Sequence, residues 1–191
     1  MIKKLEAIVW CSGALLVHFV AFNEAKATEA DCSALTSIYE NTRNSGRYQV
    51  TFSEIEPGET KSKFLMDERF QDGLIYWQLG DGIWLERPRV PLDVSLTVFE
   101  SCTKLDSKTI EGRTVDVYNA NWRRGPREAK VVFYVTPETG LVFEATRRFT
   151  RVADDETLSK WKPGTTIIER FTYDRNLSAP PKPPLLPETD D

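Results

Sequence analysis

The sequence predicts an α+β fold, in which an N-terminal helix packs on a strongly curved antiparallel sheet of about nine strands, a half-open barrel. Three observations indicate this fold. Helical spacing of apolar residues occurs in one segment near residue 35, short segments rich in aromatic and β-branched residues follow up to residue 173, and glycine-containing turns separate several of them. A helix with one apolar face must cover that face, and the sheet is the neighbour that this sequence offers.

Residues 1–27 contain the three parts of a secretory signal peptide. Lys3 and Lys4 precede an apolar stretch over residues 7–22, and Ala25-Lys26-Ala27 provides a small-x-small cleavage site. The apolar stretch is shorter than the roughly 20 residues of a typical spanning helix. We therefore expect export to the periplasm with cleavage of residues 1–27. The alternative is an uncleaved anchor that holds the same domain at the inner membrane.

Residues 28–174 are expected to form a single domain, followed by a proline-rich tail, 175–191, in an extended polyproline II conformation. The tail is expected to be a recognition segment, a strap across the sheet edge or a free end. Removal of residues 1–27 takes away three of the 25 basic and two of the 29 acidic residues, which leaves a net charge of −5. That charge argues against a nucleic-acid partner. The domain is long enough to bury its own core, so we expect a monomer.

Two cysteines, Cys32 and Cys102, remain after cleavage, since Cys11 leaves with the signal. In an exported protein this pair predicts a disulfide. The chain-entropy relation gives such a bridge a stabilisation of roughly 4 kcal/mol. The alternative is two buried free thiols, and a zinc site is not expected from two cysteines without histidine.

The first element is a short helix, because apolar residues recur at three- and four-residue spacing from Leu35 to Thr42. Asp31 or Ser33 is expected to cap its start and Gly46 to end it. Turns at 71–73 and 80–82 carry aspartate and glycine, and a turn at 136–140 ends with glycine. The expected strands form an antiparallel meander and cover residues 48–56, 61–70, 74–79, 83–87, 96–105, 113–122, 130–136, 141–151 and 165–173.

Two neighbouring segments, 74–79 and 83–85, are apolar on both faces, which is unexpected where one face of a sheet meets water. Partial cover by the helix, together with a curved sheet that encloses an apolar cavity, would account for this pattern. Strand aromatics are the candidates for lining the cavity and binding a ligand: Phe64, Tyr76, Trp77, Trp84, Tyr118, Phe133 and Phe143. The alternative is an ordinary core that these aromatics fill.

The order of these elements resembles that of a known family. An aspartate-glycine turn introduces Leu74-Ile-Tyr-Trp77, a second precedes Ile83-Trp84, and Phe133-Tyr-Val-Thr-Pro-Glu-Thr-Gly-Leu141 follows later. In this respect the chain resembles the periplasmic lipoprotein carriers, the LolA/LolB-like superfamily, over most of residues 32–173. The resemblance implies a half-open barrel with an apolar cavity that ferries acylated lipoproteins between membranes.

Charged residues also form local clusters. Arg123-Arg124 with Arg127, and Arg147-Arg148 with Arg151, predict either solvated strand edges or a docking patch for an acidic partner or anionic lipid headgroups. The acidic run at 154–156 predicts either a solvated helix start or a cation site.

Catalysis is not expected, because the one histidine, His18, lies in the signal. A nucleophilic serine would then need a lysine base, and no Ser-x-x-Lys stands at a credible helix start. A carboxylate pair is the other option, but the strand carboxylates Asp116, Glu144 and Glu169 are expected to face solvent. We therefore expect a periplasmic protein without cofactor or metal that binds an apolar ligand, an acyl chain, lipid or acylated lipoprotein, for transport. The alternative is a non-catalytic module with a filled core that binds an envelope protein.

Overall fold

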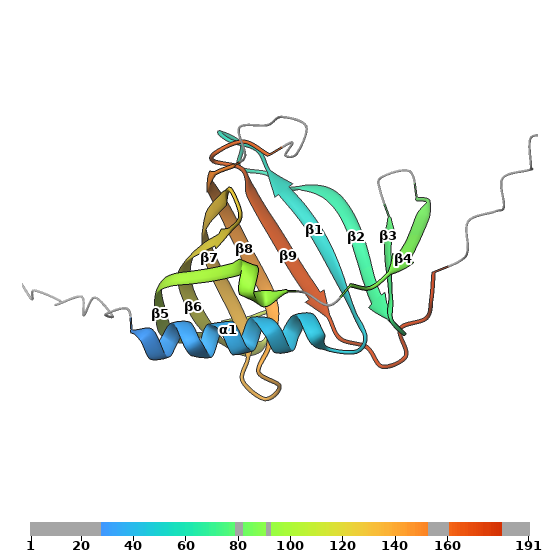
Figure 1. The fold of residues 1–191 in the computed structure, drawn as a ribbon, viewed down its shortest axis with the longest axis horizontal. Helices are drawn as coiled ribbons and strands as arrows, with labels where there is room; N and C mark the ends of the chain where they lie inside the picture. Colours follow the sequence, from blue (N-terminus) through green and yellow to red (C-terminus); the bar gives the residue numbers. More distant parts are fainter. Residues whose placement is uncertain (1–27, 79–81, 91–92, 153–160, 181–191) are drawn as a thin grey trace, which may run out of the picture.

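A computed structural model describes residues 28–78, 82–90, 93–152 and 161–180, and among them it contains one α-helix and nine strands (Figure 1). The helix is α1 (Glu29–Asn44), and a short 3-10 turn covers Val94–Leu96. The strands are β1 (Tyr48–Ile55), β2 (Lys63–Gln71), β3 (Leu74–Gln78), β4 (Trp84–Pro88), β5 (Thr97–Ile110), β6 (Arg113–Arg124), β7 (Arg127–Thr136), β8 (Leu141–Arg151) and β9 (Thr166–Thr172). The expected signal peptide, the acidic run at 154–156 and residues 181–191 of the tail lie outside the described residues.

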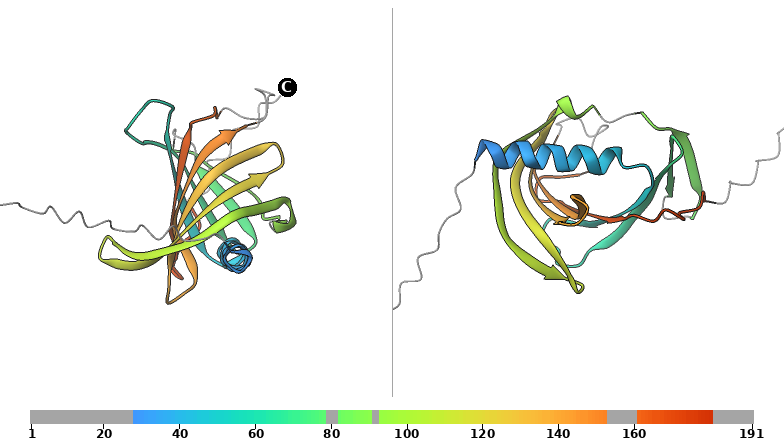
Figure 2. Two further views of the ribbon diagram at one scale, coloured as in Figure 1. Left: turned by 90° about the vertical axis from the view of Figure 1, so that its left-hand side faces the viewer. Right: turned by 90° about the horizontal axis from the view of Figure 1, so that it is seen from below.

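All nine strands form one antiparallel sheet, which confirms the predicted α+β half-open barrel. Their order is β4-β3-β2-β1-β9-β8-β7-β6-β5. The expectation of one continuous meander is therefore wrong in one respect: β9 inserts between β1 and β8 and joins two meanders, β1 to β4 and β5 to β9. As a result the consecutive strands β4 and β5 form opposite edges, and the sheet curls without closing (Figure 2).

Helix α1 lies across the open, concave side of the sheet (Figure 2). Its cap is Thr28, whose Oγ1 accepts from the Asp31 amide at 3.0 Å, so the expected caps Asp31 and Ser33 are wrong and lie three and five residues too late. The predicted apolar face is confirmed, since Leu35, Tyr39 and Thr42 are buried. The predicted Cys32–Cys102 disulfide is also confirmed and joins the first turns of α1 to β5.

The helix makes its main contacts with β5 and β8. Its main cover thus lies away from the apolar strands β3 and β4, whose second face the sequence predicted it to cover in part. Residues of β3 are half-buried, and Leu85 on β4 is 42% exposed. The helix covers the other half of the sheet because the disulfide and the sheet order place it beside β5.

The connection from β4 to β5 crosses the same open side as α1 (Figure 1). Arg89 in this connection donates to two carbonyls at the end of the helix, those of Arg43 and Ser45. Carbonyl groups at a helix C-terminus lack internal partners and carry partial negative charge, so a guanidinium there is favourable. Two layers, the helix with this connection and the sheet, therefore face each other.

Aromatic side chains fill the space under the first half of the helix. Tyr39 of α1, Phe99 of β5 and Phe133 of β7 meet edge to face, with ring centroids 5.5 to 6.1 Å apart. Near the helix end, Tyr48 stacks on Phe70 at 4.4 Å. The filled-core interpretation is therefore right at these two places, and the space between them is the site described next.

Candidate ligand cavity

A cavity of about 450 Å³ lies between the concave face of the sheet and the layer formed by α1 and the β4–β5 connection. Its lining differs from the apolar one that the sequence predicted, because six arginines and two glutamates take part. The charged residues are Arg43, Arg87, Arg89, Arg124, Arg127, Arg147, Glu68 and Glu169. The apolar and aromatic residues are Tyr39, Tyr48, Phe52, Met66, Phe70, Ile75, Val90, Trp122, Phe149, Trp161 and Ile167.

Three of the charged residues form a buried triad. Glu169 on β9 accepts from Arg43 Nη2 at 2.8 Å through one oxygen and pairs with Arg147 Nη1 through the other. The Glu169 and Arg147 side chains are 3% and 8% exposed, and that of Arg43 is 14% exposed. A buried charge is tolerated when it is paired and hydrogen-bonded. In this triad one carboxylate faces two guanidinium groups, so it neutralises only part of their positive charge.

Several buried donors that belong to lining residues have no acceptor among the described residues. These are Arg147 Nε and Nη2, Arg43 Nε and Trp122 Nε1. The Arg147 guanidinium lies over the Trp122 ring, 5.3 Å from its centroid, so these two side chains are neighbours in the cavity wall. Buried donors are nearly always satisfied in native proteins, so this end of the cavity has hydrogen-bonding capacity for a ligand or for water.

The same surroundings shift the acid–base behaviour of the residues. Burial lowers the pKa of Arg147 to about 10, and the charges of Arg43 and Arg124 act in the same direction. Burial alone would raise the pKa of Tyr39, but Arg43 and Arg147 outweigh it, and the pKa falls below its usual value. Burial raises the pKa of Glu68, against the opposing effect of Arg43 and Arg87. The cavity therefore favours negative charge at its arginine-rich end.

The sequence-predicted aromatic residues lie elsewhere. None of Phe64, Tyr76, Trp77, Trp84, Tyr118, Phe133 and Phe143 is among the residues that line this cavity. Phe133 and Tyr118 are buried, and they are opposite each other on β7 and β6. Phe143 is buried beside Arg113. Phe64 is 55% exposed.

The three β3 and β4 aromatics divide between the two faces of the sheet. Trp77 pairs with Glu68 in the register, so it shares the concave face, where Arg87 lies over its ring at 5.4 Å. Tyr76 pairs with Arg69 and points the other way, and Arg69 also lies 4.5 Å over Trp84. Neighbours on a strand point to opposite faces, so a run of aromatics cannot line one cavity.

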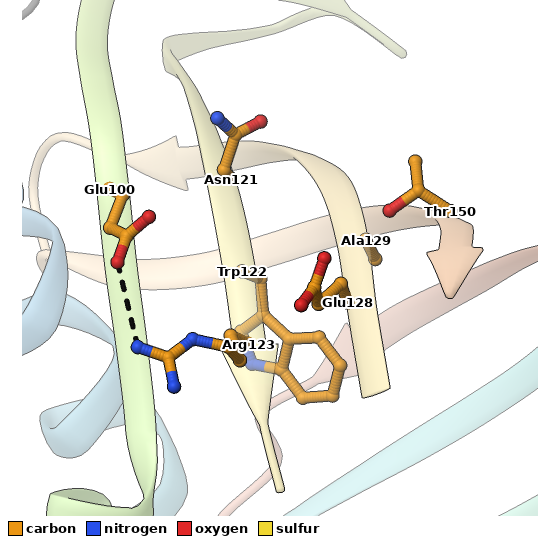
Figure 3. Close-up of a pocket in the computed structure, with 7 residues that line it drawn as sticks. All are labelled: Glu100, Asn121, Trp122, Arg123, Glu128, Ala129 and Thr150. Carbon is orange, nitrogen blue, oxygen red and sulfur yellow. Dashed lines mark ion pairs between the residues drawn. The ribbon is translucent and has the colours of Figure 1, made fainter. Parts of the chain in front are cut away.

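A second, smaller hollow of about 230 Å³ shares Trp122 with the cavity (Figure 3). Figure 3 shows Glu100 and Arg123 facing each other from adjacent strands, and their ion pair measures 3.6 Å. Glu128, also in this hollow, pairs with Arg151 at 3.5 Å. Exposed pairs of this kind contribute little, and they already neutralise the charges present, so this hollow has less capacity for a charged ligand.

The basic clusters were the sequence signal for the cavity. Arg124, Arg127 and Arg147 line it, whereas Arg123, Arg148 and Arg151 are exposed. Each cluster thus divides between the two faces of its strands. The sequence could flag the clusters as an anion-binding patch, but it gave no sign of the donor Trp122. The prediction that Glu169 faces solvent is wrong, because Glu169 is buried and paired with two arginines.

Metal-ligating side chains do not gather at any site in the described part of the chain, where no three of the His, Cys, Asp and Glu residues could hold an ion together. Within the same residues, no helix has the length and apolar character needed to cross a membrane.

No protein-family model and no curated sequence matches this chain, but solved structures do. The chain is similar to the Mycobacterium tuberculosis lipoprotein LppX, with a TM-score of 0.44 and 9% identity over 75% of this chain and 93% of LppX. It is similar to MucB, with a TM-score of 0.40 and 15% identity over 75% of this chain and 59% of MucB. A third structure is an outer membrane lipoprotein-sorting protein domain from Vibrio parahaemolyticus, with a TM-score of 0.24 and 8% identity over 76% of this chain and 93% of that domain.

Proposed function

We propose that this protein is a monomeric, non-catalytic carrier of the periplasm that holds an acyl-chain ligand in the cavity between α1 and the sheet. The observation that carries the proposal is the cavity itself. Its volume of about 450 Å³ falls within the range of ligand pockets, roughly 300 to 1,000 Å³. The core around it is filled, so the space is a defined site and not a general looseness of packing.

The apolar wall supplies the affinity for an acyl chain. Phe149 of β8 stacks on Trp161 at 5.1 Å, and Phe52, Met66 and Ile167 continue the wall toward β1 and β2. Burial of apolar surface contributes about 25 cal/mol per Å², so a chain along this wall gains affinity with each methylene that it buries.

The chemistry of the lining supports binding over catalysis. The described lining residues include no serine, threonine, cysteine, histidine or lysine. Arginine stays protonated and is a poor general base, and both oxygens of Glu169 are engaged by guanidinium groups. The groups that remain are suited to hold a ligand.

Native mass spectrometry of the mature protein, followed by lipid analysis of the released species, tests the proposal. A co-purifying acyl species, or uptake of a fluorescent fatty acid by delipidated protein, is the expected result. Ile75→Trp, which adds bulk to the cavity wall, should reduce uptake. Tyr76→Trp, on the next residue and the opposite face, is the matched control and should not. A clean mass with no uptake would overturn the proposal.

The seven aromatic residues predicted from the sequence stay a prediction in their own right. Trp77→Ala and Phe133→Ala in the same uptake assay would check it. Loss of uptake in a variant whose circular dichroism is unchanged would support a role in binding, and normal uptake would remove the residue from the site.

A second candidate function, docking of an envelope protein, is favoured by the edge strand β4. One side of β4 has no neighbouring strand in the described sheet, and Leu85 on it is exposed. An open edge can pair with a strand of a partner. Crosslinking in the periplasm through a photoreactive residue at position 85 would capture such a partner, and a Pro substitution at position 86 should abolish the adduct.

A further inference from the structure

The cavity concentrates positive charge in an acidic protein. Its lining holds six arginines against two glutamates, whereas the whole chain has a net charge of −4. No carboxylate among the described residues lies within ion-pair distance of Arg124, and the one carboxylate of the buried triad is shared by two arginines. Arg43 and Arg147 share one buried negative charge, and because buried charges are normally compensated, their end of the cavity favours an anion.

Unpartnered donors mark the place where the anion would sit. Arg147 is 7% exposed and Trp122 is 6% exposed, and both line the cavity. Arg147 Nε and Nη2 and Trp122 Nε1 have no acceptor among the described residues. Arg124, two residues after Trp122 on the same strand, lines the cavity as well. Residues i and i+2 of a strand share a face, so Trp122 and Arg124 approach the cavity side by side.

We propose that Arg147, Trp122 and Arg124 form an oxyanion site that binds the carboxylate or phosphate head of the ligand. This inference rests on the proposed function, because it places the headgroup in the same cavity that buries the acyl chain. A guanidinium edge presents two parallel donors that match the two oxygens of a carboxylate or phosphate. The Trp122 indole supplies a third donor beside them. The acyl chain leaves this site along Phe149 and Trp161.

The chemistry separates an oxyanion from a neutral acceptor. Water or an ester carbonyl could accept from the same donors, but neither would compensate for the unbalanced charge. An anion in this partly buried site both accepts the hydrogen bonds and offsets the positive charge. Charge-assisted hydrogen bonds are also shorter and stronger than neutral ones.

Calorimetric titration of the delipidated mature protein with dodecanoate, dodecyl phosphate and 1-dodecanol tests the site, since the three share one chain length. We expect at least one of the two anions to bind about tenfold or more tightly than the alcohol. Arg124→Gln and Trp122→Phe should each reduce that preference while the affinity for 1-dodecanol is retained. Arg148→Gln, at an exposed arginine beside Arg147, is the matched control and should keep the full preference.

The outcomes are distinguishable. Equal affinities for the anions and 1-dodecanol would overturn the oxyanion site and leave the carrier proposal standing. Absence of binding for all three would overturn the carrier proposal. Inorganic phosphate that binds as tightly as dodecyl phosphate would assign the site to the free anion and overturn its role as a headgroup site. Arg147→Lys keeps a charge near Glu169 but loses the fork, so loss of anion preference in that folded variant would independently support the site.

Discussion

Glu169 is the residue that allows two arginines to lie inside the molecule. Its carboxylate pairs with Arg43 from the helix and Arg147 from the neighbouring strand, and it is almost completely buried. Breaking a buried ion pair on one side is more costly than removing the whole pair, because an uncompensated charge stays behind. The triad is therefore a sensitive point for stability.

Glu169→Gln should lower the free energy of unfolding by about 3 kcal/mol, since both guanidinium groups lose their counter-charge. Urea denaturation at neutral pH measures this. Glu100→Gln removes the partner of the exposed Arg123 and serves as the control, with an expected loss under about 1 kcal/mol. Equal losses in the two variants would show that Glu169 contributes no more than a surface pair.

Glu68 makes a prediction about pH. Burial raises its pKa in the folded state, so folding favours the protonated carboxyl. Below the pKa of the unfolded chain, about 4.3, both states are protonated and the burial carries no charge penalty. As pH rises through the raised folded pKa, the charged form becomes buried and stability falls.

We therefore expect Glu68→Gln to be more stable than the parent at pH 7 and to match it near pH 4. Denaturation curves of the two proteins at both pH values provide the measurement. A variant that is less stable at pH 7 would mean that attraction to Arg43 and Arg87 outweighs the burial of Glu68.

At the scale of elements, α1 depends on attachments at both ends. The Cys32–Cys102 disulfide joins its start to β5, and Arg89 holds the carbonyls at its end. Between them, Thr42 Oγ1 accepts from the Val142 amide of β8 at 3.0 Å. A helix of 16 residues is marginal by itself in water, so these attachments and the buried face keep it over the cavity.

Replacement of both cysteines by serine should lower the free energy of unfolding by roughly 4 kcal/mol, the chain-entropy value for a bridge that spans 70 positions. Thermal or urea unfolding with and without reductant measures the effect. The parent under reducing conditions should approach the double variant, whereas the double variant should not respond to reductant. No loss in either case would mean that the bridge does not constrain the unfolded chain.

The whole molecule uses the two faces of its sheet differently. The concave face holds the cavity, while residues 175–180 lie against residues of the other face. Arg69 Nη1 donates to the Ser178 carbonyl at 3.3 Å, and Gln71, with its amide turned to suit both groups, bonds to Leu177 and Ala179. Residues 175–180 thus form a strap on the sheet beside β2.

Truncation after Asp174 should lower the urea midpoint and leave dodecanoate affinity unchanged, because the strap and the cavity lie on opposite faces. Truncation after Pro180 keeps the contacts of the strap and is the matched control. A weaker affinity in the shorter form alone would indicate that the strap influences the cavity through the sheet.

The sequence determined the elements of this protein. Apolar spacing from Leu35 to Thr42 predicted the helix, strand segments between glycine turns predicted the nine strands, and the pair Cys32 and Cys102 predicted the disulfide. The helix and the strands depend on local geometry, which residues near each other in sequence specify. The disulfide joins distant residues, but two cysteines allow only one pairing. The insertion of β9 beside β1 depends on contacts between distant segments, and no local pattern carries it.

Tertiary structure alone decided the site. The sequence contained both arginine clusters, but it could not tell which arginine of each cluster turns inward, since a shift of one residue moves a side chain to the opposite face. It also could not show that Glu169 pairs with Arg43 from 126 positions away, or that the aromatic run on β3 divides between two faces. Aromatic content suggested an apolar cavity, and the fold instead placed charge at one end of it, because only the assembled sheet brings α1, β6, β8 and β9 together.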